Sequence, residues 1–254
     1  MKITFLGTGT SQGIPVVGCD CTVCSSKDPR DYRLRSGVLI EINEINILID
    51  TGPDLRYQML RNKVKRVDAI LYTHEHNDHI IGLDDIRPFN FAQKMDMPLY
   101  AMPRVAGELE NRFGYVFSEN QYPGLPRAVL HRIESPESFE ISGHIVTPIQ
   151  VMHGNLPILG YRFGDFSFIT DASYINRENI ERLKGTKILT INALQKKNHH
   201  SHFTLDEALD LIAQVNPDRA YVTHISHRMG KTIEWEKELP KNVFPAFDGL
   251  QFFI

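Results

Sequence analysis

The sequence predicts an α/β fold in which two groups of β-strands alternate with amphipathic helices. Short β-rich runs recur along the whole chain, and helical hydrophobic spacing lies between many of them. With 254 residues, 42% of them hydrophobic, the chain holds enough apolar material for a sizeable core. No linker, fixed-period repeat or low-complexity tract divides it, so we predict one domain over residues 1–254.

The first group of strands lies in the N-terminal third of the chain. The candidate strands are residues 2–6 (KITFL), 38–42 (VLIEI), 45–50 (INILID) and 69–73 (AILYT). Asn43 and Glu44 form the expected turn between the second and third of them. Residues 54–62 (DLRYQMLRN) follow Pro53 and have helical spacing, so we expect a helix there.

The middle of the chain is less regular. A helix is expected from Pro103, because Val105, Leu109 and Phe113 recur at spacings of four. Residues 85–136 as a whole show little periodicity and contain several prolines. We therefore predict an insertion there that covers the functional site.

The second group of strands lies in the C-terminal half. The candidates are residues 144–152 (HIVTPIQVM), 158–163 (ILGYRF), 166–170 (FSFIT), 187–192 (KILTIN) and 219–224 (RAYVTH). Gly164 and Asp165 separate two of these strands and predict a tight hairpin. Helical patterns cover residues 177–183 and 204–215, and Thr204 with Glu207 fits a capping box.

Composition excludes several classes of protein. The formal net charge of −3 gives no general attraction to nucleic acid or to an anionic membrane. The basic run RNKVKR (61–66) is expected at the solvated C-terminal end of a helix. The N-terminal residues show no signal pattern, and no apolar run approaches the roughly 20 residues of a membrane span. We therefore expect a cytoplasmic protein.

Residues 73–79 (THEHNDH) directly follow a predicted strand and carry a dense set of metal-binding side chains: His74, His76, Asp78 and His79. Ligands on such a loop fold back around one point, because the strand fixes where the loop starts. Imidazole and carboxylate together suit zinc, manganese or iron rather than calcium. The alternative is a polar loop that is histidine-rich by chance, which this ordered pattern makes improbable.

The H-x-H-x-D-H pattern after a strand resembles the signature of the metallo-β-lactamase-fold hydrolases. The later marks of that family are matched in order by His153 in VMHGN, Asp171 in FSFITDAS and His224 in AYVTH. The resemblance extends over residues 2–228. It implies a four-layered αββα sandwich of the metallo-β-lactamase type.

The resemblance also implies two active-site metal ions, zinc or manganese. Its ligand set comprises His74, His76 and His153 for one ion, Asp78, His79 and His224 for the other, and a bridging Asp171. Asp50 matches a family aspartate that supports such ligands from behind. Alternatively, Asp50 caps the turn that follows it.

Two ions about 3.5–4 Å apart turn a bridging water into a hydroxide nucleophile and neutralise charge that builds on a phosphoryl or acyl oxygen. The catalytic residues are expected to be Asp78 and His202. His202 precedes a predicted helix, whose N-terminus lowers the pKa of an imidazolium that donates a proton. His199 and His200 are alternatives for that role, and His202 could instead only pack.

Four segments indicate the branch of the family: FLGTGTSQGIPVVGCDCTVC, HIIGLDDIRPFN, SHFTLDEAL and THISH. They closely resemble the phosphoribosyl 1,2-cyclic phosphate phosphodiesterase (PhnP-like) branch, so a small cyclic phosphodiester is the expected substrate. Gly7 and Gly9 either let the backbone approach a phosphate or only form a tight turn. Arg87 either contacts the phosphate or pairs with Asp84 or Asp85.

Other functions stay open. A tRNA 3′-processing nuclease shares the ligand set, but the chain has no Gly-rich, basic arm to grip tRNA, and its net acidity disfavours a large RNA. A thioesterase or lactonase of the same fold would not explain the branch-specific segments. A non-enzymatic metal-binding module ranks last, because every ligand position is filled. An edge strand or residues 85–136 could mediate a homodimer.

All three cysteines of the chain lie in CDCTVC, at Cys19, Cys21 and Cys24. A C-x-C pair is strained as a disulfide, whereas three thiolates suit a tetrahedral zinc that needs one further ligand. His227 in THISH supplies it, and the PhnP-like branch has this same site. We therefore predict a structural zinc; the alternatives are buried thiols that only pack, or a redox role without a partner.

Overall fold

The computed structural model of the chain describes residues 1–118, 123–134 and 136–254. These residues form two compact units. The first comprises Met1–Leu6, Gly37–Ser135 and Gln251–Phe253; the second comprises Gly7–Ser36, Pro136–Leu250 and Ile254. The single domain expected over residues 1–254 is compatible with two such units and stays a prediction.

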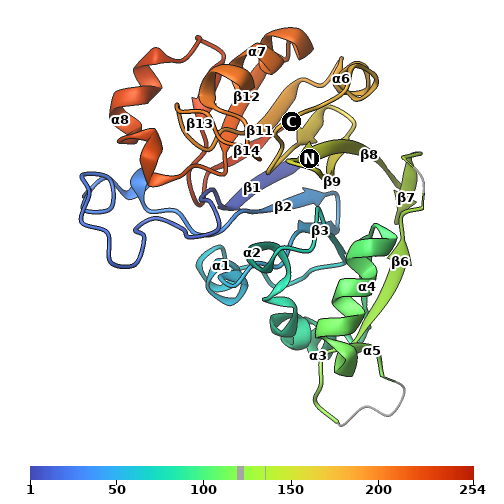
Figure 1. The fold of residues 1–254 in the computed structure, drawn as a ribbon. Helices are drawn as coiled ribbons and strands as arrows, with labels where there is room; N and C mark the ends of the chain where they lie inside the picture. Colours follow the sequence, from blue (N-terminus) through green and yellow to red (C-terminus); the bar gives the residue numbers. More distant parts are fainter. Residues whose placement is uncertain (119–122, 135) are drawn as a thin grey trace. The chain divides into compact units, whose positions relative to one another are not determined.

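The first unit is built on a mixed seven-stranded sheet with the order β14-β1-β2-β3-β4-β5-β6 (Figure 1). Its strands are β1 (Lys2–Gly7), β2 (Gly37–Ile42), β3 (Ile45–Ile49), β4 (Ala69–Leu71), β5 (Met97–Ala101), β6 (Ala128–Arg132) and β14 (Gln251–Phe253). The β2–β3 hairpin is antiparallel, whereas β3 to β6 run parallel. Parallel strands end at the same edge of a sheet, so the loops after β3 and β4 start close together.

Helices of the first unit bury their apolar sides against this sheet. They are α1 (Leu55–Arg61), α2 (Asn77–Ile80), the 3₁₀ turn η2 (Leu83–Ile86), α3 (Arg87–Gln93), α4 (Pro103–Arg112) and α5 (Gly114–Phe117). One hydrophobic cluster joins strand residues such as Leu48 to Leu55 of α1 and to Val105 and Leu109 of α4. These side chains have essentially no solvent exposure, and burial of each stabilises the unit by about 1.5–3 kcal/mol.

The second unit contains another mixed seven-stranded sheet, with the order β13-β12-β11-β10-β9-β8-β7. Its strands are β7 (Phe139–Ile141), β8 (His144–His153), β9 (Leu156–Phe163), β10 (Phe166–Phe168), β11 (Ile188–Asn192), β12 (Arg219–Thr223) and β13 (Val243–Pro245). The β9–β10 hairpin turns at Gly164, whose φ of 56° suits glycine. This confirms the predicted hairpin.

Two amphipathic helices and several short turns complete the second unit. They are η1 (Pro29–Asp31), α6 (Arg177–Leu183), α7 (Leu205–Val215), η3 (His227–Met229), α8 (Thr232–Trp235) and η4 (Glu236–Glu238). Leu205, Leu211 and Ile212 on the apolar side of α7 join a core with Ile191 of β11. The predicted capping box is confirmed, because Thr204 and Glu207 bond each other's backbone amides.

The predicted strands and helices are confirmed with small shifts of their ends. Residues 85–136, expected as an insertion, supply the strands β5 and β6 and the helices α3 to α5 of the first unit. Residues 119–122 and 135 of that segment lie outside the described residues. The expectation that the segment covers the functional site stays a prediction.

The basic run differs from expectation. Only Arg61 belongs to α1, and residues 62–66 continue beyond its end.

Among the described residues, no helix is both long and apolar enough to span a bilayer.

Candidate metal centres

In the first unit, the predicted metal-binding loop runs from β4 into α2. His74 and His79 are fully buried, and His76 precedes α2 as its N-cap. His74 Nε2 lies 3.1 Å from His76 Nδ1, and His79 Nε2 lies 3.2 Å from an oxygen of Asp78. The loop after β4 therefore holds four side chains of metal-binding type close together, as we expected from the sequence.

Asp50 lies directly behind this loop. One carboxylate oxygen accepts a hydrogen bond from the Thr73 amide at 2.8 Å, and the other lies 2.7 Å from His79 Nδ1. The Thr73 hydroxyl also donates to Asp50 at 2.8 Å. Burial raises the pKa of Asp50, while the contact with His79 acts in the opposite direction. These contacts with Thr73 and His79 favour support of a ligand over capping of the turn that follows Asp50.

In the second unit, His153 is the last residue of β8, and Asp171 and His224 follow the strands β10 and β12. His224 Nδ1 lies 3.1 Å from one carboxylate oxygen of Asp171, which also accepts a 2.6 Å hydrogen bond from the Thr170 hydroxyl. His153 Nδ1 donates to the Ser201 carbonyl at 2.7 Å. That bond places a proton on Nδ1 and leaves the Nε2 lone pair available to a metal.

His202 joins the same cluster. Its ring lies 4.6 Å from the His153 ring and 5.0 Å from the His224 ring, centre to centre, and its Nδ1 lies 4.0 Å from Asp171. Its Nδ1 is buried without a hydrogen-bond partner among the described residues. Such an atom, next to a carboxylate, fits a site that takes a further group.

The cause predicted for the pKa of His202 is wrong. Burial first, and then the neighbouring His224, lowers the pKa of His202 to about 3. Helix α7 starts only at Leu205 and is capped by Thr204, so His202 lies outside the helix terminus. The alternative donor His199 lies 5.1 Å from His202, ring to ring, and burial also lowers its pKa.

Three of the predicted site residues adopt a left-handed backbone conformation. The φ angles are 64° at Asp50, 57° at Asp171 and 54° at His224. Residues other than glycine rarely adopt such angles, and those that do cluster at functional sites.

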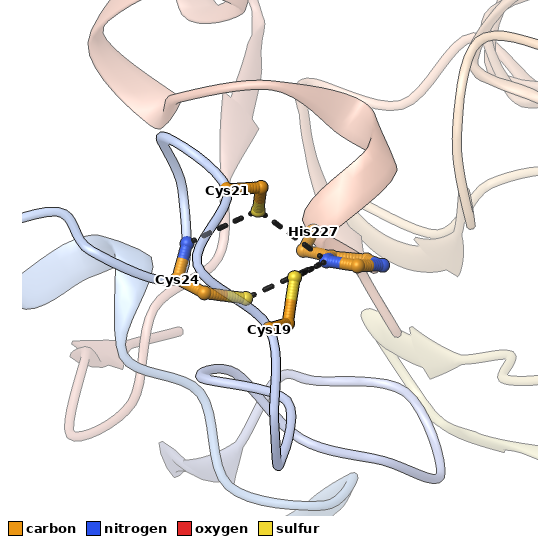
Figure 2. Close-up of side chains that lie close together, drawn as sticks. All are labelled: Cys19, Cys21, Cys24 and His227. Carbon is orange, nitrogen blue, oxygen red and sulfur yellow. Dashed lines mark hydrogen bonds between the residues drawn. The ribbon is translucent and has the colours of Figure 1, made fainter.

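A second type of donor set lies entirely within the second unit (Figure 2). The sulfurs of Cys19, Cys21 and Cys24 lie 3.3, 3.5 and 3.5 Å from His227 Nδ1. All four ligand atoms lie within 4.8 Å of one another. The loop after β1 and the turn η3 after β12 thus meet at this cluster, although about 200 residues separate them in the chain.

The geometry of this cluster fits zinc. In a tetrahedral site with Zn–S near 2.3 Å and Zn–N near 2.0 Å, a sulfur and a nitrogen ligand lie about 3.5 Å apart. Backbone amides also donate to the sulfurs, Val16 to Cys24 and Cys24 to Cys21, both at 3.4 Å. The amide of Cys24 lowers the pKa of the Cys21 thiol to about 6, whereas burial raises that of Cys24 to about 11.

The structure shows local roles for residues that the sequence suggested as substrate contacts: Gly7, Gly9 and Arg87. A Cβ at Gly9 would lie 2.9 Å from Arg33 and Leu34 backbone oxygens, so close packing explains this glycine. Gly7 ends β1. Arg87 is exposed on α3. Burial raises the pKa of Asp85 while the charge of Arg87 acts to lower it, and the Asp84 carboxylate accepts a 2.8 Å hydrogen bond from Tyr115.

Sequence reasoning missed the threonines that precede the ligands. Thr73 bonds Asp50 and lies 2.9 Å from His74 Nδ1, and Thr170 bonds Asp171. The sequence contains a sign of them, because Thr73, Thr170 and Thr223 each stand directly before a candidate ligand. The hydroxyls of Thr73 and Thr170 contact the neighbouring ligand-type side chain and can orient it.

Comparison with known proteins defines the family. Residues 45–225 match the model of the beta-lactamase superfamily domain. An octanoyltransferase of Porphyromonas gingivalis is 40% identical over 256 residues, which cover 100% of this chain and 52% of that protein. A ribonuclease Z of Bacillus velezensis is 28% identical over 167 residues, covering 64% of this chain and 48% of that protein. The chain thus spans about half the length of these curated relatives.

Among solved structures, a diphosphatase from the PhnP family is 41% identical, with a TM-score of 0.93 over 99% of this chain and 96% of that chain. The chain therefore belongs to the beta-lactamase superfamily, and the predicted metallo-β-lactamase fold is confirmed. Within that superfamily its sequence and fold match the PhnP family, as the branch-specific segments indicated.

Proposed function

We propose that this protein is a dinuclear metal-dependent phosphodiesterase that hydrolyses a small cyclic phosphodiester. The observation that carries the proposal is the pair of donor sets at strand ends, one in each unit, within a PhnP-like chain. Imidazole and carboxylate donors in these sets fit zinc or manganese. The proposed ligands are His74, His76 and His153 for one ion, Asp78, His79 and His224 for the other, and Asp171 between them.

When bound, two such ions supply a nucleophile at neutral pH and Lewis acidity toward the phosphoryl oxygens. The residues of the chain prepare the ligands for this role. Asp50 accepts the Nδ1 proton of His79, and the Ser201 carbonyl accepts that of His153. Each bond fixes the tautomer in which Nε2 carries the lone pair.

His202 is proposed to protonate the leaving oxygen. Its side chain lies within the His153–Asp171–His224 cluster, and at neutral pH it is an uncharged imidazole. The negative charge of a bound phosphate favours the protonated ring, which then has a proton to donate. An alkoxide leaves poorly without such a proton. Asp78, the other residue proposed for catalysis, lies beside His79.

A diphosphatase is the second candidate, because the PhnP-family structure that is 41% identical to this chain has that activity. Both reactions displace an oxygen from phosphorus, but they differ in the leaving group. A diphosphate releases a phosphate, which is a much better leaving group than a sugar alkoxide. Dependence on His202 therefore separates the two candidates.

The experiment is a turnover panel with metal-loaded protein: a ribose 1,2-cyclic phosphate, a linear phosphodiester, a nucleoside diphosphate, precursor tRNA, a thioester and a lactone. The proposal expects the cyclic phosphodiester to be hydrolysed with the largest kcat/KM. Faster cleavage of the diphosphate would establish the second candidate. Faster cleavage of tRNA, thioester or lactone would reject both.

The Cys19–Cys21–Cys24–His227 cluster is proposed to hold a structural zinc. It ties the loop after β1 to the turn that follows His224. A site of three thiolates needs a reducing compartment, which supports the cytoplasmic location expected from the sequence.

A further inference from the structure

The first unit contains a polar cavity of about 270 Å³ that lies apart from the histidine loop. It is lined by side chains of β14, β1, β2 and β3 and by the segment after α1: Lys2, Thr4, Leu39, Glu41, Asn46, Asn62, Lys63, Val64, Lys65, Arg66 and Gln251. Lys2 and Thr4 lie on the same face of β1 as the core residue Leu6, since strand side chains alternate. An otherwise apolar face therefore becomes polar and basic at this end of the sheet.

The segment after α1 forms the basic wall of the cavity. Helix α1 ends where Lys63 adopts a φ of 55° and the Val64 amide donates to the Met59 carbonyl at 2.9 Å. This bonding pattern terminates the helix and directs residues 62–66 out of it. These residues, which the proposed metal chemistry does not use, line the cavity.

The charges of the cavity favour an anion. Four basic residues and one acidic residue, Glu41, are among those that line it, which gives a formal charge of 4 − 1 = +3. Lys2 pairs with Glu41 at 2.7 Å, and Arg66 pairs with Asp68 at 2.7 Å. Lys63 and Lys65 form no ion pair with any residue that the structure describes. Their positive charge is therefore available to a ligand.

An independent observation is the hydroxyl of Thr4. Thr4 is 1% exposed, and its Oγ1 has no hydrogen-bond partner among the described residues. A buried hydroxyl without a partner is costly, so natural proteins rarely keep one without a reason. Thr4 is one of the residues that line the cavity, together with Lys63 and Lys65.

We propose that this cavity binds a phosphate group, as inorganic phosphate or as a phosphate monoester, with the Thr4 hydroxyl and the Lys63 and Lys65 ammonium groups as donors. Donors from β1 and from the segment after α1 approach from different directions. They match the three terminal oxygens of a phosphate better than the two of a carboxylate. This site is separate from the proposed active centre and does not depend on the proposed function.

The test follows backbone amide chemical shifts of the zinc-loaded full chain during titration with inorganic phosphate, and in a second arm with phenyl phosphate. Sodium chloride at equal ionic strength is the control. We expect saturable shifts at Thr4, Asn46 and residues 63–66. Tighter binding of phenyl phosphate would identify a monoester site, and tighter binding of inorganic phosphate a site for the free ion; either supports the proposal.

Two variants locate the binding. Thr4→Val should weaken binding about tenfold without lowering Tm, because it removes an unpaired buried hydroxyl. Lys63→Ala should also weaken it several-fold, while Lys94→Ala, which changes an exposed lysine with a similar φ of 53°, should not. Equal shifts with chloride, no saturable shifts at these residues, or unchanged affinity in Thr4→Val would each overturn the proposal.

Discussion

His79 Nδ1 lies 2.7 Å from a carboxylate oxygen of Asp50, and both side chains are buried. The loop after β3 thus controls the tautomer of a histidine in the loop after β4. Because Asp50 binds no metal in the proposed ligand set, its contribution can be measured separately from that of the ligands.

The variant Asp50→Asn keeps the shape of this side chain but removes its charge. Outer partners of this kind change metal affinity by about 10- to 100-fold, so we expect an affinity loss of that size. Competition with a chelator measures it. Asp165→Asn, at a partly exposed aspartate of the second unit that pairs with Lys187, is the control. Equal affinities in the two variants would show that Asp50 does not support the centre.

Replacement of His202 by alanine should affect substrates unequally. We expect kcat to fall by about 10²- to 10⁴-fold for diesters with alkyl leaving groups, because they need a proton donor. Diesters that release p-nitrophenol should be affected little. A plot of log kcat against leaving-group pKa for wild type and variant measures this difference. A uniform loss across the series would mean that His202 only positions its neighbours.

The variant Cys21→Ser should lose one tightly held zinc per chain. Since the metal is expected to tie two distant segments together, the free energy of unfolding should fall by several kcal/mol, on the order expected for a structural zinc. Elemental analysis of chelator-washed protein and thermal unfolding check both effects. Ser25→Ala changes an exposed residue in the same loop and serves as control. A washed wild-type protein without this zinc would contradict the assignment.

The capping box before α7 gives a further test of the fold around His202. Thr204→Ala removes the side-chain acceptor for the Glu207 amide and should lower the free energy of unfolding by about 1 kcal/mol. Thr204→Ser keeps the acceptor and should change it far less. Urea unfolding of the two variants decides this, and equal losses would indicate a packing effect of the methyl group instead.

The local parts of the candidate site were predictable from the sequence. His74, His76, Asp78 and His79 form one short motif directly after a buried strand, so position along the chain already implies proximity. Three thiolates leave one zinc position to fill, and the resemblance of THISH to the PhnP-like branch indicated His227 as the fourth ligand. In both cases the chemistry of the donors limited the possible partners.

Other features depend on which strands pair with each other, and strand pairing is difficult to predict from the sequence. The contact of Asp50 with Thr73 exists because β3 and β4 run parallel with their ends together. Strands β5 and β6 were missed, since their residues lie among prolines and show no clear alternation. The low pKa of His202 arises from burial among side chains of other strands, which no local pattern reveals.

The hydrolysis of bis(p-nitrophenyl) phosphate by the metal-loaded Asp171→Asn variant tests the central claim most directly. Asp171 is the proposed bridging ligand, and its loss removes several kcal/mol of charge stabilisation, so kcat/KM should fall about a hundredfold or more. Asp165→Asn should retain wild-type activity. Wild-type activity in Asp171→Asn, with an unchanged metal content, would contradict the account.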